Sequence, residues 1–270
     1  MSRRIYNRKI TAPFTVLLIS LLALLTYANI YAFEYIKANF LNSSIFTLKG
    51  VSIYGNNKTK PDDIIDASGL DVGNSKISLL IPHIVEGNIR LLSPFMDQVD
   101  IERDLYKGWV TINVRERKPE AFVLESTDYF TVVDSSGYIL DRNANRDIAL
   151  SLYGNLPVII SSDLAVRRFE ENNIEFSYLV SHSLASALNI LRVARELDLN
   201  LSEKISEIDA TDTDNIMLLL KNKMIVRIAD DRLKEGLIDA EYWINRFGSD
   251  YSVEKFQYID ARFYDTIYCG

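Results

Sequence analysis

The chain has 270 residues, a net charge of −7 and one cysteine. One cysteine excludes an intramolecular disulfide framework. The first nine residues carry four of the 30 basic residues, which leaves 26 basic against 37 acidic ones, a net charge of −11, for the rest of the chain. Such an acidic surface repels phosphate backbones, so nucleic acid is excluded as the expected partner.

The amino terminus predicts a membrane-spanning helix. Ile10 to Phe33 is a run of twenty-four residues without a charge, and about twenty apolar residues cross a bilayer core of about 30 Å. Arg3, Arg4, Arg8 and Lys9 precede the run, and positive charge next to a span stays in the cytoplasm. The alternative is a cleaved signal peptide, but the run exceeds the usual apolar length and no Ala-x-Ala site follows it. We therefore expect a retained anchor, with the carboxyl-terminal bulk exported.

After the anchor, the pattern changes to that of a small α/β unit. A β-prone run from Phe46 to Ile53 stops at a Gly-Asn-Asn turn. Thr59 and Asp62 have the spacing of a capping box, and they predict a short helix over Pro61 to Ser68.

A second helix is predicted to begin at Pro82, because proline is tolerated only in the first turn, and to run to Leu92. We expect Ile84, Ile89, Leu91 and Leu92 to supply its buried side.

Two strands follow, Gln98 to Arg103 and Trp109 to Val114, around the turn Tyr106-Lys107-Gly108. Apolar and polar residues alternate in both, as in a half-buried hairpin. The predicted order of this unit is β-α-α-β-β.

The remainder, about 120–270, reads as an antiparallel sheet flanked by two helices. Tyr129 to Val133 pairs with Tyr138 to Leu140, and Met217 to Leu220 pairs with Met224 to Ile228, because short turns separate the strands of each pair. Two apolar stripes have helical spacing and indicate helices packed on the sheet. The first comprises Leu184, Ala187, Leu188, Leu191 and Ala194, and the second comprises Leu233, Leu237, Ala240, Ile244 and Phe247.

Several short motifs occur in a fixed order along the chain. They are Phe46 to Asn56, Gly73-Asn74, the V-x-E-R-x-P-x-A string from Val114 to Ala121, Val133 to Leu140, Leu156 to Ile159, and Ile259 to Phe263. Together with the anchor and the β-α-α-β-β order, these motifs resemble the bacterial cell division family FtsQ, called DivIB in Gram-positive bacteria. Two departures are visible: Tyr106-Lys107-Gly108 lies where the family usually has a proline, and Ala261 replaces a usual leucine.

The resemblance implies an α+β protein with a cytoplasmic tail (1–9), a transmembrane helix (10–33), a POTRA domain (46–116) and a carboxyl-terminal β domain (120–270). It further implies a scaffold of the divisome in the inner (cytoplasmic) membrane at the division septum. This scaffold links early cytoplasmic components with late septal peptidoglycan synthesis proteins, chiefly through the small single-pass proteins FtsB and FtsL.

No residue pattern supports catalysis, a metal or a cofactor, and no small-molecule substrate is expected. The resemblance places the two histidines, His83 and His182, in different domains, so they cannot share a metal. Ser181-His182-Ser183 lacks the geometry of a nucleophile and base, and we expect a solvated helix face there. Asp239 and Glu241 are expected on a polar helix face.

The family's motif before its last strand matches Ile259 to Phe263, so Tyr264 to Tyr268 should be an edge strand where FtsB adds a strand. The expected partner-binding residues are Arg262, Phe263, Tyr264, Asp265, Thr266, Ile267 and Tyr268. These aromatic side chains could instead only close the domain core.

Two other functions are alternatives. A POTRA module for outer-membrane protein assembly or secretion is disfavoured because no long series of amphipathic strands follows. A membrane-tethered envelope hydrolase is disfavoured because no catalytic constellation is visible.

Overall fold

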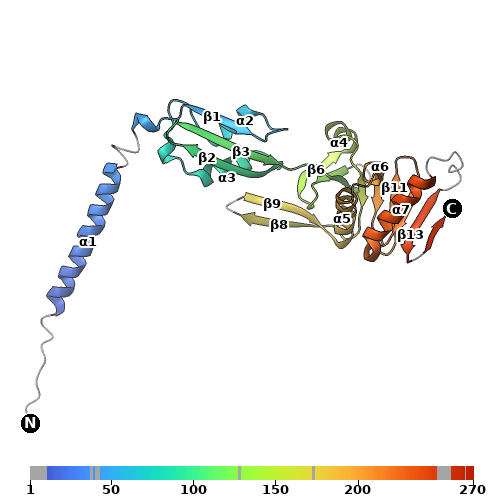
Figure 1. Cartoon of the computed structure of the whole chain (residues 1–270). Helices are drawn as coiled ribbons and strands as arrows, with labels where there is room; N and C mark the ends of the chain where they lie inside the picture. The colour runs from blue at the N-terminus through green and yellow to red at the C-terminus, as the bar shows by residue number, and fades with distance from the viewer. Residues whose placement is uncertain are drawn as a thin grey trace, which may run out of the picture. The chain divides into compact units, whose positions relative to one another are not determined.

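The computed structural model of the chain describes residues 11–36, 39, 43–126, 129–171, 174–247, 257–264 and 266–270 (Figure 1). Contacts divide the chain into two units. One comprises Met1–Ile89 with Val99–Val114, and the other comprises Arg90–Gln98 with Arg115–Gly270. The domain limits expected from the sequence, 46–116 and 120–270, stay predictions.

The first helix, α1 (Thr11–Ile36), is the one helix among the described residues that is long and apolar enough to cross a membrane, over Thr15–Ile36. It continues three residues past the expected end at Phe33 and contains one charged residue, Glu34. Ile10 and the four basic residues before it lie outside the described residues.

The first unit forms a three-stranded sheet with two helices. Its elements are η2 (Ser44–Phe46), β1 (Gly50–Tyr54), α2 (Pro61–Ser68), η3 (Ile77–Leu79), α3 (Pro82–Arg90), β2 (Met96–Asp104) and β3 (Trp109–Glu116). The boundary between the units passes through α3, β2 and β3, so Arg90, Met96–Gln98 and Arg115–Glu116 belong to the second unit. The strand order is β1-β3-β2, with β1 parallel to β3. The predicted β-α-α-β-β order is confirmed.

Local details of this unit differ from the sequence prediction. The first strand begins at Gly50, because Phe46 belongs to the 3-10 turn η2. Helix α2 has the predicted bounds and ends at Gly69 in the left-handed region, with φ of 66°. The capping box is wrong, since Lys60 is the N-cap and its side chain makes no capping hydrogen bond.

The buried side of α3 was also predicted incorrectly in part. Ile89 is buried as expected, but the second buried residue is Val85, four positions earlier on the same helical face. Ile84, Leu91 and Leu92 are exposed. The helix ends at Arg90, so the two leucines fall outside its regular face.

The second unit contains the larger sheet. Its strands are β4 (Ala121–Ser126), β5 (Tyr129–Val133), β6 (Ile139–Asn145), β7 (Val158–Ile160), β8 (Ala165–Glu171), β9 (Ile174–Val180), β10 (Ile205–Asp209), β11 (Ile216–Leu220), β12 (Ile225–Ile228), β13 (Tyr258–Phe263) and β14 (Thr266–Cys269). Its helices are α4 (Arg146–Tyr153), α5 (His182–Glu196), α6 (Leu201–Lys204), η4 (Asp230–Arg232) and α7 (Leu233–Phe247).

Nine of these strands form one sheet in the order β14-β13-β12-β11-β10-β7-β4-β5-β6, and β8 pairs with β9 in a separate hairpin. The α+β class and both predicted hairpins, β5–β6 and β11–β12, are confirmed. The sheet is mixed, however, because β4–β7, β7–β10 and β12–β13 pair in parallel. Parallel neighbours need a crossover, and α7 supplies the one between β12 and β13.

Two apolar clusters lie against this sheet. Ala121 and Val123 of β4 belong to the larger cluster, which includes α5 and α7, whereas Phe122 between them belongs to a second cluster with Phe130. Successive side chains of a strand point to opposite faces. Strand β4 is therefore buried on both faces, which explains its run of fully buried apolar residues.

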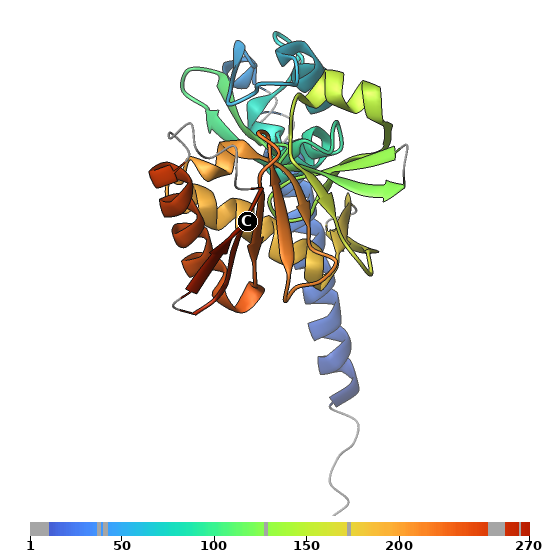
Figure 2. The ribbon, with the colours of Figure 1, turned by 90° about the vertical axis from the view of Figure 1, so that its right-hand side faces the viewer.

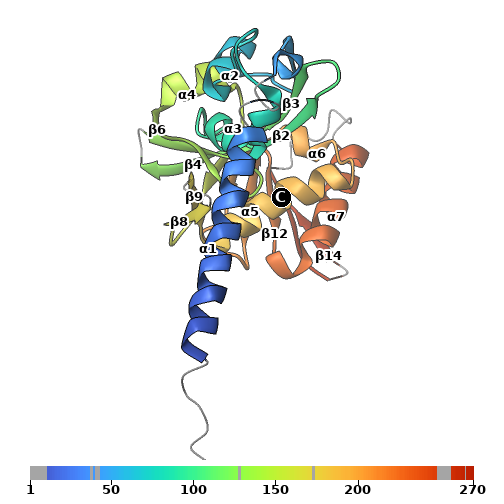
Figure 3. The ribbon, with the colours of Figure 1, turned by 90° about the vertical axis from the view of Figure 1, so that its left-hand side faces the viewer.

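Helices α5 and α7 cover one face, as the two apolar stripes predicted. Figure 3 shows them side by side against the strands, and Figure 2 views the unit from the opposite side, with the orange strands of residues 215–230 toward the viewer. Helix α7 approaches β13 closely: a Cβ added at Gly236 would lie 3.2 Å from the carbonyl oxygen of Ala261. The stripe residues with described side chains are buried, namely Leu184, Ala187, Leu188, Leu191, Ala194, Leu233, Leu237, Ala240 and Ile244.

Candidate functional site

The last strand of the chain forms one edge of the nine-stranded sheet. Strand β14 pairs antiparallel with β13, with Ile259 opposite Cys269 and Asp260 opposite Tyr268. No further strand lies on the outer side of β14 within the described part of the chain. An edge of this kind presents backbone donors and acceptors that another strand can use.

The register tells which backbone groups of β14 face outward. Tyr258 and Gly270 exchange two backbone hydrogen bonds of 3.0 and 3.2 Å. Exchanging and non-exchanging pairs alternate along an antiparallel ladder. Tyr268 therefore directs its backbone toward β13, and Ile267 and Cys269 direct their N–H and C=O groups away from the sheet.

The side chains of β14 divide between the two faces. Ile267 and Cys269 are half-buried and pack on the large apolar cluster. Tyr268 is on the opposite face with 55% of its surface exposed, and its ring contacts the exposed ring of Phe263 edge-on, with centroids 5.5 Å apart. Exposed aromatic rings beside an open strand edge provide the anchors that strand addition uses for specificity.

A buried arginine holds the turn that leads into β14. Arg232, from η4, is 6% exposed and donates hydrogen bonds from one nitrogen to the carbonyl oxygens of Ala261, at 3.1 Å, and Phe263. Its other terminal nitrogen pairs with Asp239 at 2.9 Å. The guanidinium carbon lies 4.9 Å from the ring centroid of Tyr264. Arg232 thus fixes the backbone carbonyl groups at the end of β13.

A second ion pair orders the face that carries Tyr268. Arg262 binds Asp260 in a bidentate manner, with nitrogen–oxygen distances of 2.8 and 2.7 Å. Desolvation raises the pKa of Asp260, but the hydrogen bonds and charge of Arg262 outweigh it, so this pKa lies below its ordinary value. The same guanidinium lies 5.2 Å from the ring centroid of Phe263.

The structure places the predicted partner-binding residues in one hairpin. Arg262 and Phe263 end β13, and Thr266, Ile267 and Tyr268 belong to β14. Tyr264 is in the intervening turn rather than in the strand. Asp265 lies outside the described residues. Whether these residues bind a partner stays a prediction.

Sequence reasoning missed Arg232. It lies 29 residues from Ala261 in the chain, inside a charged stretch where nothing distinguishes it from a solvated arginine. Only the crossover of α7 brings it beneath β13.

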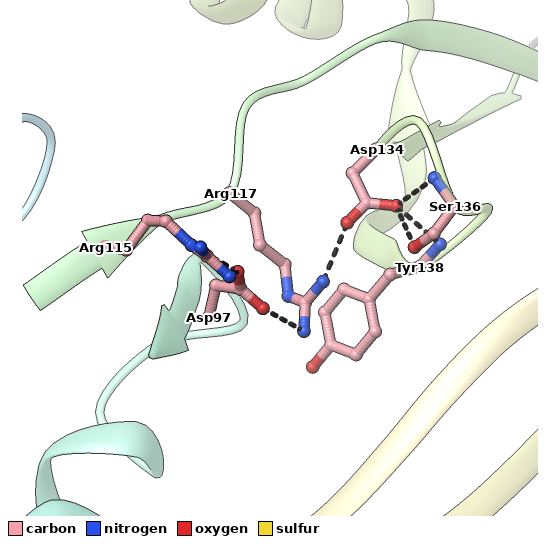
Figure 4. A network of polar contacts seen from close by, with 6 residues as sticks. All are labelled: Asp97, Arg115, Arg117, Asp134, Ser136 and Tyr138. Carbon is pink, nitrogen blue, oxygen red and sulfur yellow. Dashed lines mark hydrogen bonds and ion pairs between the residues drawn. The ribbon is translucent and has the colours of Figure 1, made fainter. Parts of the chain in front are cut away.

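Two of the motifs meet in a polar network within the second unit, shown in Figure 4. Arg117 forms ion pairs with Asp97 and Asp134, each at 2.8 Å, and Arg115 also pairs with Asp97. Asp134 in turn accepts hydrogen bonds from the backbone N–H groups of Ser136 and Tyr138. Arg117, the second arginine of the V-x-E-R string, therefore pairs with the first residue of the Asp-Ser-Ser-Gly turn and stabilises that turn.

The guanidinium of Arg117 also stacks on Tyr138, with 4.0 Å between its carbon and the ring centroid. Burial raises the pKa of the Tyr138 hydroxyl above its ordinary value despite the charge of Arg117. Arg117 has 12% of its side chain exposed, and an arginine that is paired and stacked in this way holds neighbouring groups in one geometry. We assign this network a structural role in positioning the start of β4.

The serines around His182 differ from the expectation of a solvated helix face. Ser181 is the N-cap of α5, accepting a hydrogen bond from the Leu184 N–H at 2.9 Å. Ser183 is buried, and its hydroxyl lies 2.7 Å from that of Ser161. His182 is exposed and points to Asp230 at 3.9 Å. The serines serve capping and packing, because Ser181 caps α5 and the buried Ser183 hydroxyl contacts that of Ser161.

The expected polar face at Asp239 and Glu241 is wrong for Glu241. This carboxylate is 6% exposed and accepts hydrogen bonds from the Leu201 N–H at 2.9 Å and from the Asn200 and Asn245 amides. It joins α7 to the start of α6. The described residues contain no group of three or more His, Cys, Asp or Glu side chains that could hold a metal ion.

The amino-terminal span, the β-α-α-β-β unit and the mixed sheet with an open carboxyl-terminal edge define a membrane-anchored POTRA protein. Residues 46–117 match the family described as POTRA domain, FtsQ-type, and residues 121–262 match cell division protein FtsQ/DivIB, C-terminal. Since the second match alone covers more than half of the chain, the chain belongs to the FtsQ/DivIB family of cell division proteins. Its one span among the described residues makes it a single-pass membrane protein with an extracytoplasmic domain.

A search of curated proteins returned no significant match. Among solved structures, the chain is similar to the major extracytoplasmic domain of the trans isomer of the bacterial cell division protein DivIB from Geobacillus stearothermophilus. That comparison has 12% identity and a TM-score of 0.29, and it covers 50% of this chain and 97% of the other.

Proposed function

We propose that this chain is a binding scaffold of the divisome, located in the cytoplasmic membrane at the septum with its amino terminus in the cytoplasm. It links early cytoplasmic division components to septal peptidoglycan synthesis by holding the small single-pass proteins FtsB and FtsL. Family membership supports a division role, and the four basic residues before the span support the orientation.

The main support for the proposal is the open edge of β14, the outermost strand of the sheet. FtsB adds a strand there, taking the outward backbone groups of Ile267 and Cys269, while the exposed rings of Phe263 and Tyr268 contact its side chains. Arg232 keeps the edge in an extended, binding-ready form by holding the carbonyl groups at the end of β13. A preorganised edge loses less conformational entropy on binding than a mobile one.

The test measures the affinity of the full chain, in detergent or nanodiscs, for an FtsB–FtsL complex. Tyr268→Ala should weaken binding by about tenfold or more, since an interface aromatic contributes at least 1–2 kcal/mol. Tyr242→Ala is the matched control, because Tyr242 lies on α7 with 54% exposure against 55% for Tyr268. If both variants bind equally well, the β14 edge is not the docking site.

Ile267→Pro tests the backbone contribution. Proline removes an N–H that points away from β13, so the fold should survive while strand addition loses a donor. Tyr268→Pro removes an N–H that points toward β13 and should disturb the hairpin itself. Unchanged FtsB affinity in Ile267→Pro, with a folded protein by circular dichroism, would refute strand addition.

The cellular role has a separate test. A fluorescent fusion should collect at midcell, and depletion should give filaments or chains because septation stops. Normal division on depletion would refute the scaffold role even if the purified proteins bind.

A further inference from the structure

One end of the first unit carries a group of exposed apolar and aromatic side chains. Strands β1 and β3 begin together there, with Gly50 paired to Trp109. The β2–β3 turn (Leu105–Gly108) lies at the same end, because the Lys49 N–H donates to the Gly108 carbonyl at 2.7 Å. The turn around Val72 also lies there, since the Gly73 N–H donates to the Leu48 carbonyl at 2.8 Å.

Five apolar or aromatic residues at this end have exposed side chains, which we call the tip patch: Ile45, Val72, Leu105, Tyr106 and Trp109. Tyr106, in the β2–β3 turn, is fully exposed, and Ile45 is 72% exposed. The Trp109 ring is held across Gly50, where an added Cβ would lie 2.7 Å from the indole. The patch thus combines a fixed indole with a protruding phenol.

The charge at this end is opposite in sign to that of the exported part as a whole. Backbone contacts place Lys49, Lys76 and Lys107 there with Asp71 and Asp104, a net charge of +1 for these five residues, whereas the exported part carries −11. Lys107 is 77% exposed and pairs with Asp104 at 3.4 Å. Aromatic rings interspersed with lysines are typical of surfaces that sit at the lipid headgroup level.

The chain itself keeps the tip patch near a bilayer. The 26 residues of α1 correspond to about 39 Å at 1.5 Å each, close to the roughly 40–45 Å of a bilayer with its headgroups. Tyr27, Tyr31 and Tyr35 follow one helical face near its exported end, as in an interfacial aromatic belt. From Ile36 to Ser43 the chain spans at most about 25 Å.

We propose that the tip patch docks into the headgroup layer of the membrane that α1 spans. A tether this short gives an effective concentration on the order of millimolar. A lipid contact that would be too weak to recruit the isolated domain is therefore sufficient to hold the tip on the bilayer. The contact orients the first unit at the membrane surface and is separate from the β14 edge, so it does not depend on FtsB binding.

Tryptophan fluorescence of the full chain in nanodiscs containing anionic lipid tests this contact. Trp243→Phe leaves Trp109 as the only tryptophan, since the sequence contains two. Lipids that carry a spin label at the headgroup or upper acyl chain should quench the fluorescence of Trp109. The control is Trp109→Phe/Trp243→Phe/Tyr54→Trp, whose single tryptophan should be quenched severalfold less. Tyr54 is 60% exposed at the opposite end of β1, about 13 Å further along the strand.

A second variant tests the patch directly. Leu105→Asp/Tyr106→Asp, in the Trp243→Phe background, should reduce the lipid quenching of Trp109 and red-shift its emission, while circular dichroism stays unchanged because both side chains are exposed. Quenching of Trp109 no stronger than that of the Tyr54→Trp control, or quenching insensitive to both aspartates, would overturn the proposal and leave a protein partner as the occupant of the patch.

Discussion

Replacing the buried Arg232 with methionine should loosen the β13–β14 edge by an amount that the structure allows us to work out. The variant keeps the unbranched stem but loses the two hydrogen bonds to the carbonyl groups of Ala261 and Phe263. Water can rehydrate Phe263, which is 45% exposed, but not Ala261, which is fully buried.

An unsatisfied buried carbonyl costs about 1–3 kcal/mol, and losing the cation–π contact with Tyr264 adds about 0.5–1 kcal/mol. Asp239 is 38% exposed and can be solvated once its partner is gone. We therefore expect the free energy of unfolding to fall by about 1.5–4 kcal/mol. A loss of this size is a large part of the stability of an ordinary domain.

Urea unfolding of the full chain in detergent measures this loss, with the fluorescence of Trp243 in a Trp109→Phe background as the probe. Trp243 lies in α7 and packs on the same apolar cluster. The control is Arg192→Met, since Arg192 forms an exposed ion pair with Glu196 on α5 and should cost less than about 0.5 kcal/mol. Equal losses in the two variants would refute the role assigned to Arg232.

Three further predictions concern topology, catalysis and the lone thiol. Alkaline phosphatase fused after Gly270 should be active, because the basic residues before the span retain the amino terminus in the cytoplasm; an inactive fusion contradicts this orientation. His83→Gln/His182→Gln should complement a depletion strain, and failure of a folded double variant would show that the ectodomain depends on imidazole chemistry. Burial raises the pKa of the Cys269 thiol, so at pH 8 iodoacetamide should alkylate the native chain more slowly than the unfolded chain. The alkylation rate of the native chain should still rise above pH 9. Equal rates for the native and unfolded chains would show that the thiol is not shielded in β14.

The sequence predicts the parts of the fold that depend on local signals. Pro61 and Gly69 define α2 because one residue suits a first helical turn and the other a left-handed stop. The apolar stripes of α5 and α7 predict buried faces because helical spacing puts them on one side. The polar turn around Lys221 to Lys223 likewise predicts the β11–β12 hairpin.

Pairing between distant segments is not encoded in such local patterns. The parallel pairing of β12 with β13 depends on the packing of α7, so an antiparallel sheet was the simpler expectation. Glu241 looks like any exposed helix carboxylate in the sequence, and only the position of α6 buries it. The candidate edge was located through the family's motif, whereas the arginine that supports it could be found only in three dimensions.

The close approach of α7 to β13 limits the size of the residues that the helix and the edge hairpin can carry where they meet. A Cβ added at Gly236 would lie 3.2 Å from both the Ala261 carbonyl oxygen and the Ile228 side chain, and Ala261 itself is fully buried. A larger residue at either position would force the helix outward and carry Arg232 away from its carbonyl acceptors. The helix and the hairpin therefore depend on each other, so that a larger residue at Gly236 or at Ala261 requires a compensating change in the other element.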